Sequence, residues 1–257
     1  MLDLFNEIQL PTPLIQLHCE LFEEKSVKVY LKADYLTHPL LSGNKWRKLK
    51  YNLLEAKEQG FSKLLSFGGA YSNHVYALAG VAKLTDFEVH IVIRGEELNH
   101  ESNSTLEYAH SCGVILHFVS RMEYRDKEVI ASNFGKSFFV IPEGGSNELS
   151  LCGTAEVIDE ITNEITPDNI IAAMGTGGTV AGFLKNDAFQ GQIIGIPVIK
   201  GGLGLQAAVS DLTGNVAKNL IILPDYHLGG YGKTPPFLEK FINDFRSYFG
   251  VELDKIY

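Results

Sequence analysis

Cysteine is scarce in this sequence, and its placement suggests no structural role. The 257 residues contain three cysteines, Cys19, Cys112 and Cys152, an odd number without C-x-x-C spacing. This pattern suggests neither a disulfide framework nor a cysteine zinc site. The histidines also lack metal-ligand spacing, so we predict no metal site. We expect buried, reduced cysteines in a cytoplasmic protein.

Long apolar runs and an excess of positive charge are absent as well. The N-terminus has no basic region followed by an apolar core, and no apolar run reaches the length of a membrane span. Lysine and arginine total 22 against 31 aspartates and glutamates, which gives a formal net charge of -9. This balance disfavours nucleic acid and anionic membrane surfaces as partners. A small molecule is therefore the expected partner.

Apolar strands that alternate with helices make up most of the chain. At 257 residues and 45% hydrophobic content, the length suits one large domain or two smaller ones, and we expect two. The prolines at 11 and 13 favour an extended segment, and a strand is expected at 27–32. Further strands are expected at 63–67, 88–93, 114–119, 137–141, 169–174, 192–199 and 220–223, with helices at 46–59, 73–84, 103–111, 123–134, 151–163, 203–211 and 235–249. This alternation predicts an α/β fold whose parallel sheets are covered on both faces, in three αβα layers.

Lys45 follows a Ser-Gly-Asn turn and stands at the start of the first long helical pattern. A lysine at a helix N-terminus lies beside the positive end of the helix dipole and unpaired backbone N–H groups. Both should lower its pKa and favour the neutral amine, which can attack a carbonyl. The simpler alternative is a solvated charge, because four cations occur in six residues here.

A glycine-rich turn, Gly175-Thr176-Gly177-Gly178-Thr179, lies between a predicted apolar strand and a predicted helix. In that geometry backbone N–H groups, two hydroxyls and the helix dipole converge, which suits a phosphate group. The turn is neither the spaced dinucleotide fingerprint nor a P-loop. A tight strand-to-helix connection with no ligand is the alternative.

A second glycine turn, Gly68-Gly69, precedes Ser72, Asn73 and His74 at another helix start. Serine or asparagine there is commonly a helix N-cap, although a cap explains one of the two more easily than both. A serine near a lysine amine could exchange a proton, and the asparagine could donate to an anionic oxygen. His74 is expected on the helix face, in a supporting role.

Tyrosines near the end of the chain are the remaining site candidates. Tyr231 is flanked by Gly229, Gly230 and Gly232, which leave space around its ring, and Tyr257 ends the sequence. The alternative for such tyrosines is a half-buried core residue with a solvated hydroxyl.

These motifs occur in one order that is similar to a known family. The segments are Ser42–Lys45, Gly68–His74, Pro142–Asn147, Gly175–Gly182 and Asp225–Gly232. Together they resemble the 1-aminocyclopropane-1-carboxylate deaminase and D-cysteine desulfhydrase family, over residues 11–257. These enzymes depend on pyridoxal phosphate and have the tryptophan synthase β-subunit fold. The resemblance implies a small lobe at 46–149, a larger lobe made of 1–45 with 150–257, and a homodimer.

The resemblance also implies a role for each matched residue. Lys45 would hold pyridoxal 5'-phosphate and act in proton transfer, and Asn73 would contact the phenolic oxygen of that cofactor. Ser72 would face the substrate carboxylate or serve as an acid–base group, while Tyr231 and Tyr257 would close the pocket. The phosphate would be held by Gly175, Thr176, Gly177, Gly178 and Thr179. The implied enzyme is a deaminase or desulfhydrase, a lyase or hydrolase that turns a small amino acid into a 2-oxo acid and ammonia.

This sequence departs from the family at two places. Trp46 replaces a common threonine, which bears on the choice of substrate. Family members also continue past the position of Tyr257 into a segment that faces the pyridine nitrogen, so we expect this sequence to be a shortened version of a longer chain. The alternative is a non-catalytic or cofactor-impaired protein that retains the fold. A nucleotide-binding α/β module is a third possibility, disfavoured by the missing fingerprints.

Overall fold

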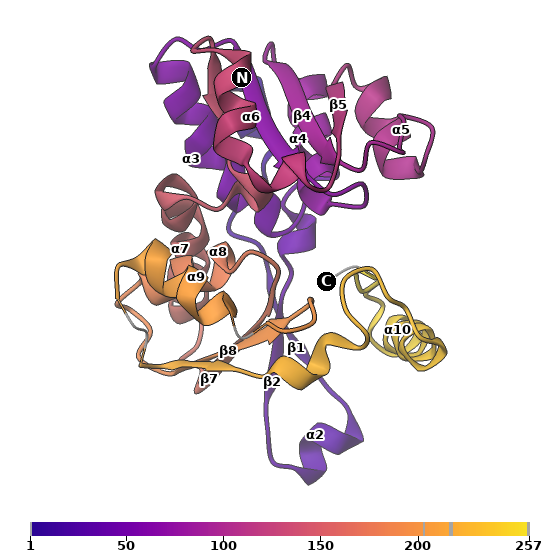
Figure 1. Cartoon of the computed structure of the whole chain (residues 1–257). Coiled ribbons are helices and arrows are strands. Elements are labelled where there is room, and N and C mark those ends of the chain that lie inside the picture. Colours follow the sequence, from indigo (N-terminus) through magenta and orange to yellow (C-terminus); the bar gives the residue numbers. More distant parts are fainter. Residues whose placement is uncertain (1, 203, 216–217, 256–257) are drawn as a thin grey trace. The chain divides into compact units, whose positions relative to one another are not determined.

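The computed structural model describes residues 2–202, 204–215 and 218–255 (Figure 1). By its internal contacts the chain divides into two units, one of Met1–Leu10 with Tyr35–Thr154 and one of Pro11–Asp34 with Ala155–Tyr257. These bounds differ from the lobes expected from the sequence, chiefly because two early segments join the first unit. The reason is hydrophobic packing, since Leu4 and Leu41 belong to the same buried cluster as Trp46.

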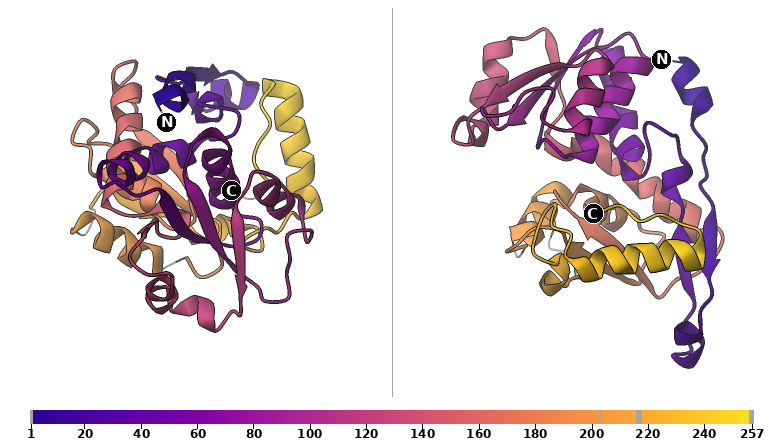
Figure 2. Two further views of the ribbon diagram at one scale, coloured as in Figure 1. Left: turned by 90° about the horizontal axis from the view of Figure 1, so that it is seen from above. Right: turned by 90° about the vertical axis from the view of Figure 1, so that its right-hand side faces the viewer.

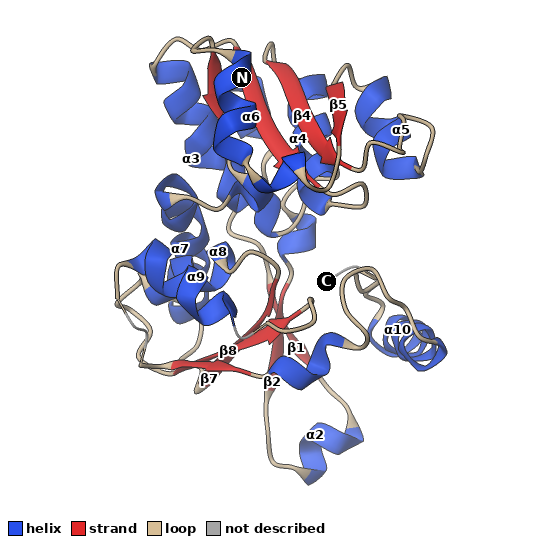
Figure 3. Cartoon of the chain, in the orientation of Figure 1, coloured by secondary structure: helices blue, strands red, loops and turns tan. Residues whose placement is uncertain are grey.

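The first unit contains a four-stranded parallel sheet in the order β5-β4-β3-β6. Helices in blue and strands in red alternate along this part of the chain in Figure 3, as the sequence predicts. The strands are β3 (Lys63–Gly68), β4 (Glu88–Arg94), β5 (Ile115–Val119) and β6 (Phe138–Val140). The helices are α1 (Leu2–Glu7), α3 (Asn44–Glu58), α4 (Asn73–Leu84), α5 (Ser104–Ser111) and α6 (Lys127–Phe134), with short 3-10 turns η1 (Asp34–Leu36), η2 (Glu123–Arg125) and η3 (Glu143–Gly145).

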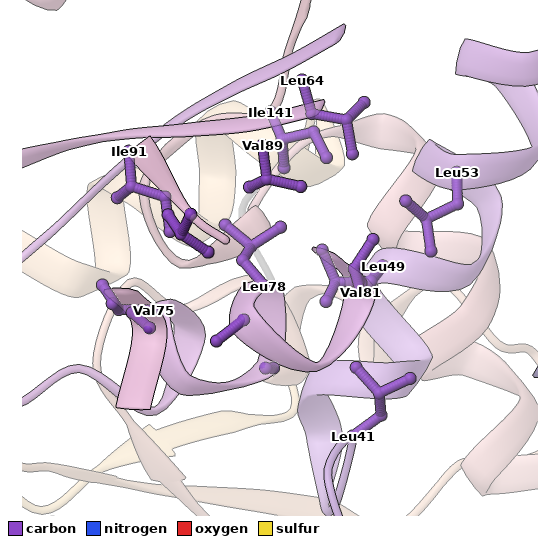
Figure 4. Packing of buried hydrophobic residues seen from close by; sticks show 14 of the residues in the cluster. Leu41, Leu49, Leu53, Leu64, Val75, Leu78, Val81, Val89, Ile91 and Ile141 are labelled. Carbon is purple, nitrogen blue, oxygen red and sulfur yellow. The ribbon is translucent and has the colours of Figure 1, made fainter. Parts of the chain in front are cut away.

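Both faces of this sheet are covered, as expected. Successive strand residues point to opposite faces, so Leu64 packs in one cluster and Leu65 in another. The larger cluster joins the sheet to α3 and α4 through residues that Figure 4 shows, including Leu49, Leu78 and Val89, and to α5 through Leu106. The smaller one contains Tyr124 and is covered by α6. The three-layer prediction is therefore confirmed for the first unit.

The helix expected over 123–134 is interrupted, which corrects the sequence prediction. Asp126 lies between η2 and α6 with non-helical angles (φ -104°, ψ 74°), and its side chain accepts a hydrogen bond from the Val129 N–H. An aspartate that caps the second segment satisfies one of the N–H groups exposed at a helix start. The local cap thus overrides the continuous helical pattern.

Helix α1 was not predicted from the sequence, and it explains the departure at Trp46. The Trp46 side chain is fully buried, and its ring meets the Phe5 ring edge-on with 5.0 Å between centroids. Phe5 and the buried Leu4 both lie on α1. The tryptophan is accommodated as a core residue of the first unit.

The second unit has a parallel sheet in the order β7-β8-β9 and a separate antiparallel pair, β1-β2. Its strands are β1 (Leu14–Leu17), β2 (Val29–Lys32), β7 (Asn169–Met174), β8 (Gln192–Pro197) and β9 (Leu220–Ile222). Its helices are α2 (Glu20–Glu24), α8 (Gly178–Leu184), α9 (Gly204–Thr213), the 3-10 turn η4 (Pro224–His227) and α10 (Pro236–Phe249), while α7 (Glu148–Thr162) starts in the first unit and ends in the second. Helix α2, also not predicted, lies at the tip of the β1-β2 pair in Figure 1 and in the right-hand view of Figure 2.

An ion pair ties the β1-β2 pair to the end of α7. Lys32 Nζ lies 2.6 Å from Glu160 Oε2, and the Thr12 N–H donates to the same carboxylate oxygen at 3.2 Å. Lys32 also donates to the Thr12 carbonyl.

None of the helices in the described ranges is long and apolar enough to cross a membrane.

Candidate functional site

Lys45 lies in the first turn of α3, where the sequence places it. The helix begins at Asn44. The preceding Gly43 has φ 63° and ψ -152°, and a positive φ of this kind favours glycine. The Lys45 side chain is only 7% exposed. Burial excludes the alternative of a solvated charge and leaves an amine held away from water.

Lys48, three residues later on the same helix, is a second buried amine that the sequence analysis did not single out. Its side chain is 3% exposed, and its Nζ donates to the Gly144 carbonyl at 3.2 Å and the Ser146 hydroxyl at 3.0 Å. Burial, and then the positive charge of Lys45, holds the pKa of Lys48 well below its usual value. The signal in the sequence was its spacing, because residues i and i+3 share a helix face.

His74 lies in the first turn of α4 and is fully buried. Its Nε2 is 2.8 Å from the hydroxyl of Ser66, which is also fully buried on β3. Burial, followed by the positive charges of Lys45 and Lys48, holds the pKa of His74 well below its usual value. The ring is therefore a neutral imidazole near two buried amines, closer to the site than the sequence suggested.

Ser72 and Asn73 have different local roles. Ser72 is the N-cap of α4, and its Oγ accepts a hydrogen bond from the His74 N–H at 3.2 Å, while Asn73 is the first helical residue. Because that hydroxyl uses a lone pair in the cap, its hydrogen is free to be donated. The helix start is packed tightly, since a Cβ on Gly68 would lie 2.5 Å from Val75 Cγ2.

The turn η3 and the start of α7 are bound to α3 by side-chain amides. Asn52 Nδ2 donates to Asn147 Oδ1 at 3.2 Å, and Asn147 Nδ2 donates to Asn52 Oδ1 at 2.7 Å. Asn147 Oδ1 also accepts from the Ser150 N–H at 3.0 Å. The motif from Pro142 to Asn147 therefore fixes the helix that carries the two lysines.

The glycine turn of the second unit has the expected strand-to-helix geometry. Strand β7 ends at Met174, so Gly175 and Thr176 form the connection, and α8 begins at Gly178 and includes Thr179. Gly177 is the N-cap in the left-handed region (φ 84°), and a Cβ there would lie 3.0 Å from Val209 Cγ2. The first N–H groups of a helix have no partner within it, which suits an anion. Phosphate binding at this turn stays a prediction.

The roles of the two tyrosine candidates stay predictions. Tyr231 lies in the second unit after η4 and is half-buried, and Tyr257 lies outside the described residues.

In the described ranges, no group of three or more histidine, cysteine, aspartate or glutamate side chains could hold a metal ion.

Comparison with known proteins defines the class. The family described as "Pyridoxal-phosphate dependent enzyme" matches residues 6–201, so this chain belongs to that family and is a pyridoxal-phosphate enzyme. A "Putative 1-aminocyclopropane-1-carboxylate deaminase" of Thermotoga maritima is 29% identical, over 96% of this chain and 85% of that relative. A "D-cysteine desulfhydrase" of Klebsiella pneumoniae is 29% identical, over 88% and 75%. The crystal structure of an "ACC deaminase homologue" matches with TM-score 0.82 and 27% identity, covering 98% of this chain and 82% of that one.

The residues present suit this cofactor. The family requires an amine for the cofactor's aldehyde and N–H donors for its phosphate. The first unit contains such an amine, because the Lys45 side chain is 7% exposed, and the second unit contains a helix N-terminus behind Gly177, whose φ is 84°. The expected fold and cofactor are thereby confirmed at the level of the family. That these residues hold the cofactor stays a prediction.

The buried Lys48 makes stability depend on pH. Because folding lowers the pKa of Lys48, the unfolded chain binds the Lys48 proton more tightly than the folded chain does. The folded state therefore loses stability as the pH falls from the pKa of the unfolded chain towards the pKa of the folded chain. We expect the unfolding free energy of the wild type, minus that of Lys48→Met, to rise with pH by up to about 1.4 kcal/mol per unit below about pH 10.4. Chemical denaturation of both proteins between about pH 8 and pH 10 measures this slope. A difference that does not change with pH would contradict it.

Proposed function

We propose that this chain converts a small amino acid, 1-aminocyclopropane-1-carboxylate or D-cysteine, to a 2-oxo acid and ammonia. The observation that carries the proposal is the buried Lys45 on the first turn of α3, in a chain of the pyridoxal-phosphate family. The names of the Thermotoga and Klebsiella relatives support these two substrates.

Bound pyridoxal phosphate supplies an electron sink that stabilises negative charge at the substrate α-carbon. The protein's part is to bind, orient and move protons. Lys45 holds the cofactor and moves a proton at Nζ, and Asn73 contacts the phenolic oxygen. Ser72 donates its free hydroxyl hydrogen to the substrate carboxylate or exchanges a proton. The N–H groups of Gly175 to Thr179 bind the phosphate.

The remaining expectations belong to the same proposal. Tyr231 and Tyr257 close the substrate pocket, the small lobe contains residues 46–149, and the enzyme is a cytoplasmic homodimer. The pocket, the lobe and the homodimer follow from the family resemblance, whereas the cytoplasmic location follows from the sequence composition. All four are open to direct measurement.

Product release from both substrates tests the proposed function. Ring opening of 1-aminocyclopropane-1-carboxylate consumes one water and gives one 2-oxo acid and one ammonia, whereas D-cysteine also gives one hydrogen sulfide. We expect ammonia and 2-oxo acid in equal amounts from at least one substrate, with sulfide only from D-cysteine. If neither substrate yields ammonia from cofactor-loaded protein, the proposal fails and the non-catalytic alternative stands.

A further inference from the structure

Two buried amines lie on one face of α3, and the proposed function needs only one of them. Lys45 is 7% exposed and Lys48 is 3% exposed, and residues three apart share a helix face. Condensation with an aldehyde uses the lone pair of a neutral amine. One C=N bond forms, and both amine hydrogens leave with the aldehyde oxygen as one water. Because burial lowers the pKa of Lys48, this side chain supplies a neutral amine as well.

The η3 turn binds the amine of Lys48. Lys48 Nζ donates to the Gly144 carbonyl at 3.2 Å and to the Ser146 hydroxyl at 3.0 Å. The turn also packs against the same side chain, since a Cβ on Gly145 would lie 3.3 Å from Lys48 Cβ. A neutral amine has two hydrogens, and condensation would consume both of them. Lys48 can therefore react with an aldehyde only after both hydrogen bonds to the turn are broken.

Neighbouring elements hold η3 at both ends. Before the turn, the Ile141 N–H donates to the Leu65 carbonyl of β3 at 2.8 Å. After the turn, Asn147 exchanges two hydrogen bonds with Asn52 of α3, at 2.7 and 3.2 Å. A turn fixed to both β3 and α3 cannot follow the Lys48 amine if that amine moves away. The two bonds to the turn thus favour one position of Lys48 Nζ.

Glu143, the first residue of η3, is bound by η2 and α6. Tyr124 is 3% exposed and donates its hydroxyl hydrogen to Glu143 Oε1 at 3.0 Å. Lys127 Nζ lies 3.2 Å from Glu143 Oε2 and 4.6 Å from the centre of the Tyr124 ring. The next residue in the chain supplies the carbonyl that Lys48 uses. Through one peptide unit, the Glu143 carboxylate therefore helps to place that carbonyl.

We propose that the η3 turn selects between the two amines. The Gly144 carbonyl and the Ser146 hydroxyl hold Lys48 Nζ in place, and Glu143 holds the turn. Lys45 is thereby the amine that carries the cofactor. The inference rests on the proposed function, in which Lys45 is the working amine. Ser146 and Glu143 are positioning residues, because they act on the chemistry only through Lys48.

Competitive acetylation of the cofactor-free full chain tests this selection without turnover. Peptide mass spectrometry at low extents of reaction gives the acetylation rate of Lys48 divided by that of Lys45. The ratio is informative because a general loosening of α3 raises both rates together. One hydrogen bond corresponds to a factor of about 2 to 10. We expect Ser146→Ala to raise the ratio by this factor, and Glu143→Ala to raise it at least about twofold.

Two matched variants control for the loss of a serine hydroxyl and of a glutamate charge. Ser104→Ala and Glu128→Ala lie at exposed positions in the first turns of α5 and α6. Neither residue contacts η3 through a hydrogen bond in the part of the chain that the structure describes, so both variants should leave the ratio unchanged. Circular dichroism of each variant establishes that it is folded.

The position of covalent attachment tests the selection itself. Cofactor-loaded protein is reduced with borohydride, and tandem mass spectrometry locates the added mass on the lysines of α3. In Lys45→Ala, which keeps η3 intact, we expect no attachment at Lys48. When Ser146→Ala and Glu143→Ala are added to that variant, we expect attachment at Lys48, because the hydroxyl that binds this amine and the carboxylate that holds the turn are both removed.

The outcomes distinguish this proposal from the proposed function. An unchanged acetylation ratio in folded Ser146→Ala and Glu143→Ala overturns the selection by η3, even if the enzyme consumes its substrate. Attachment at Lys48 in Lys45→Ala also overturns it, as does the absence of attachment at Lys48 in the folded triple variant. If neither substrate is consumed but the ratio and the attachment change as expected, the proposed function fails and the hold of η3 on Lys48 stands.

Discussion

Lys45→Ala will lower turnover of the preferred substrate by at least about 10³-fold. The variant removes the buried amine in the first turn of α3 to which the proposed function gives the cofactor. Alanine is the best helix former, so α3 should persist. The pKa of Lys48 and of His74 should rise, because the charge of Lys45 lowers both. Steady-state ammonia release with added cofactor measures the effect.

Lys57→Ala is the matched control for this prediction. Lys57 lies in the last turn of the same helix and is exposed, so its replacement removes one positive charge without touching the site. It should retain wild-type turnover. If Lys45→Ala turns over within tenfold of Lys57→Ala, Lys45 is not the working amine.

Gly153→Ala will destabilise the protein by about 3 kcal/mol. Gly153 lies in α7, and a Cβ there would be 1.9 Å from the carbonyl oxygen of Arg47 on α3. The neighbour is backbone, so relief requires the two helices to separate by about 1 Å or more. That shift would also stretch the Asn52–Asn147 amide pair and the Lys48 hydrogen bonds to the η3 turn.

Equilibrium unfolding in denaturant measures the effect, with Gly69→Ala as the control. A Cβ on Gly69 has nothing within 4 Å, and this glycine is not at positive φ. Gly69→Ala should change the unfolding free energy by less than about 0.5 kcal/mol. A loss below about 1 kcal/mol for Gly153→Ala would show that α3 and α7 are less rigidly joined than the close approach indicates.

Much of the fold follows from local signals. Helix α4 spans 73–84 as predicted, because its cap Ser72 and its alanine-rich turns all favour one helix. Strand β7 spans 169–174 as predicted, bounded by the glycine turn. The break at Asp126 was missed because a capping aspartate inside a helical pattern is distinguishable only once its hydrogen bond is seen. Helix α1 was missed because its formation depends on packing against Trp46.

The candidate site was predictable only where the chemistry is encoded by neighbours in sequence. The Ser-Gly-Asn-Lys turn and the two glycine turns stand out by composition and position. Ser66, Lys48 and Asn52 do not, because their significance comes from burial and from partners about 8 to 98 residues away. For His74 the sequence indicates only a supporting residue on the helix face, because no sequence pattern reveals a fully buried ring whose Nδ1 has no hydrogen-bond partner among the described residues. Such tertiary features decide which polar residues serve the site.

The most direct measurement is the covalent position of the cofactor on the protein. Cofactor-loaded protein is reduced with borohydride, digested, and its peptides are weighed by mass spectrometry. The account predicts the reduced pyridoxal-phosphate mass on the peptide containing Lys45, on no other lysine peptide, and absent from Lys45→Ala. Attachment at Lys48 or elsewhere, or no attachment in the wild type, would contradict the central role of Lys45.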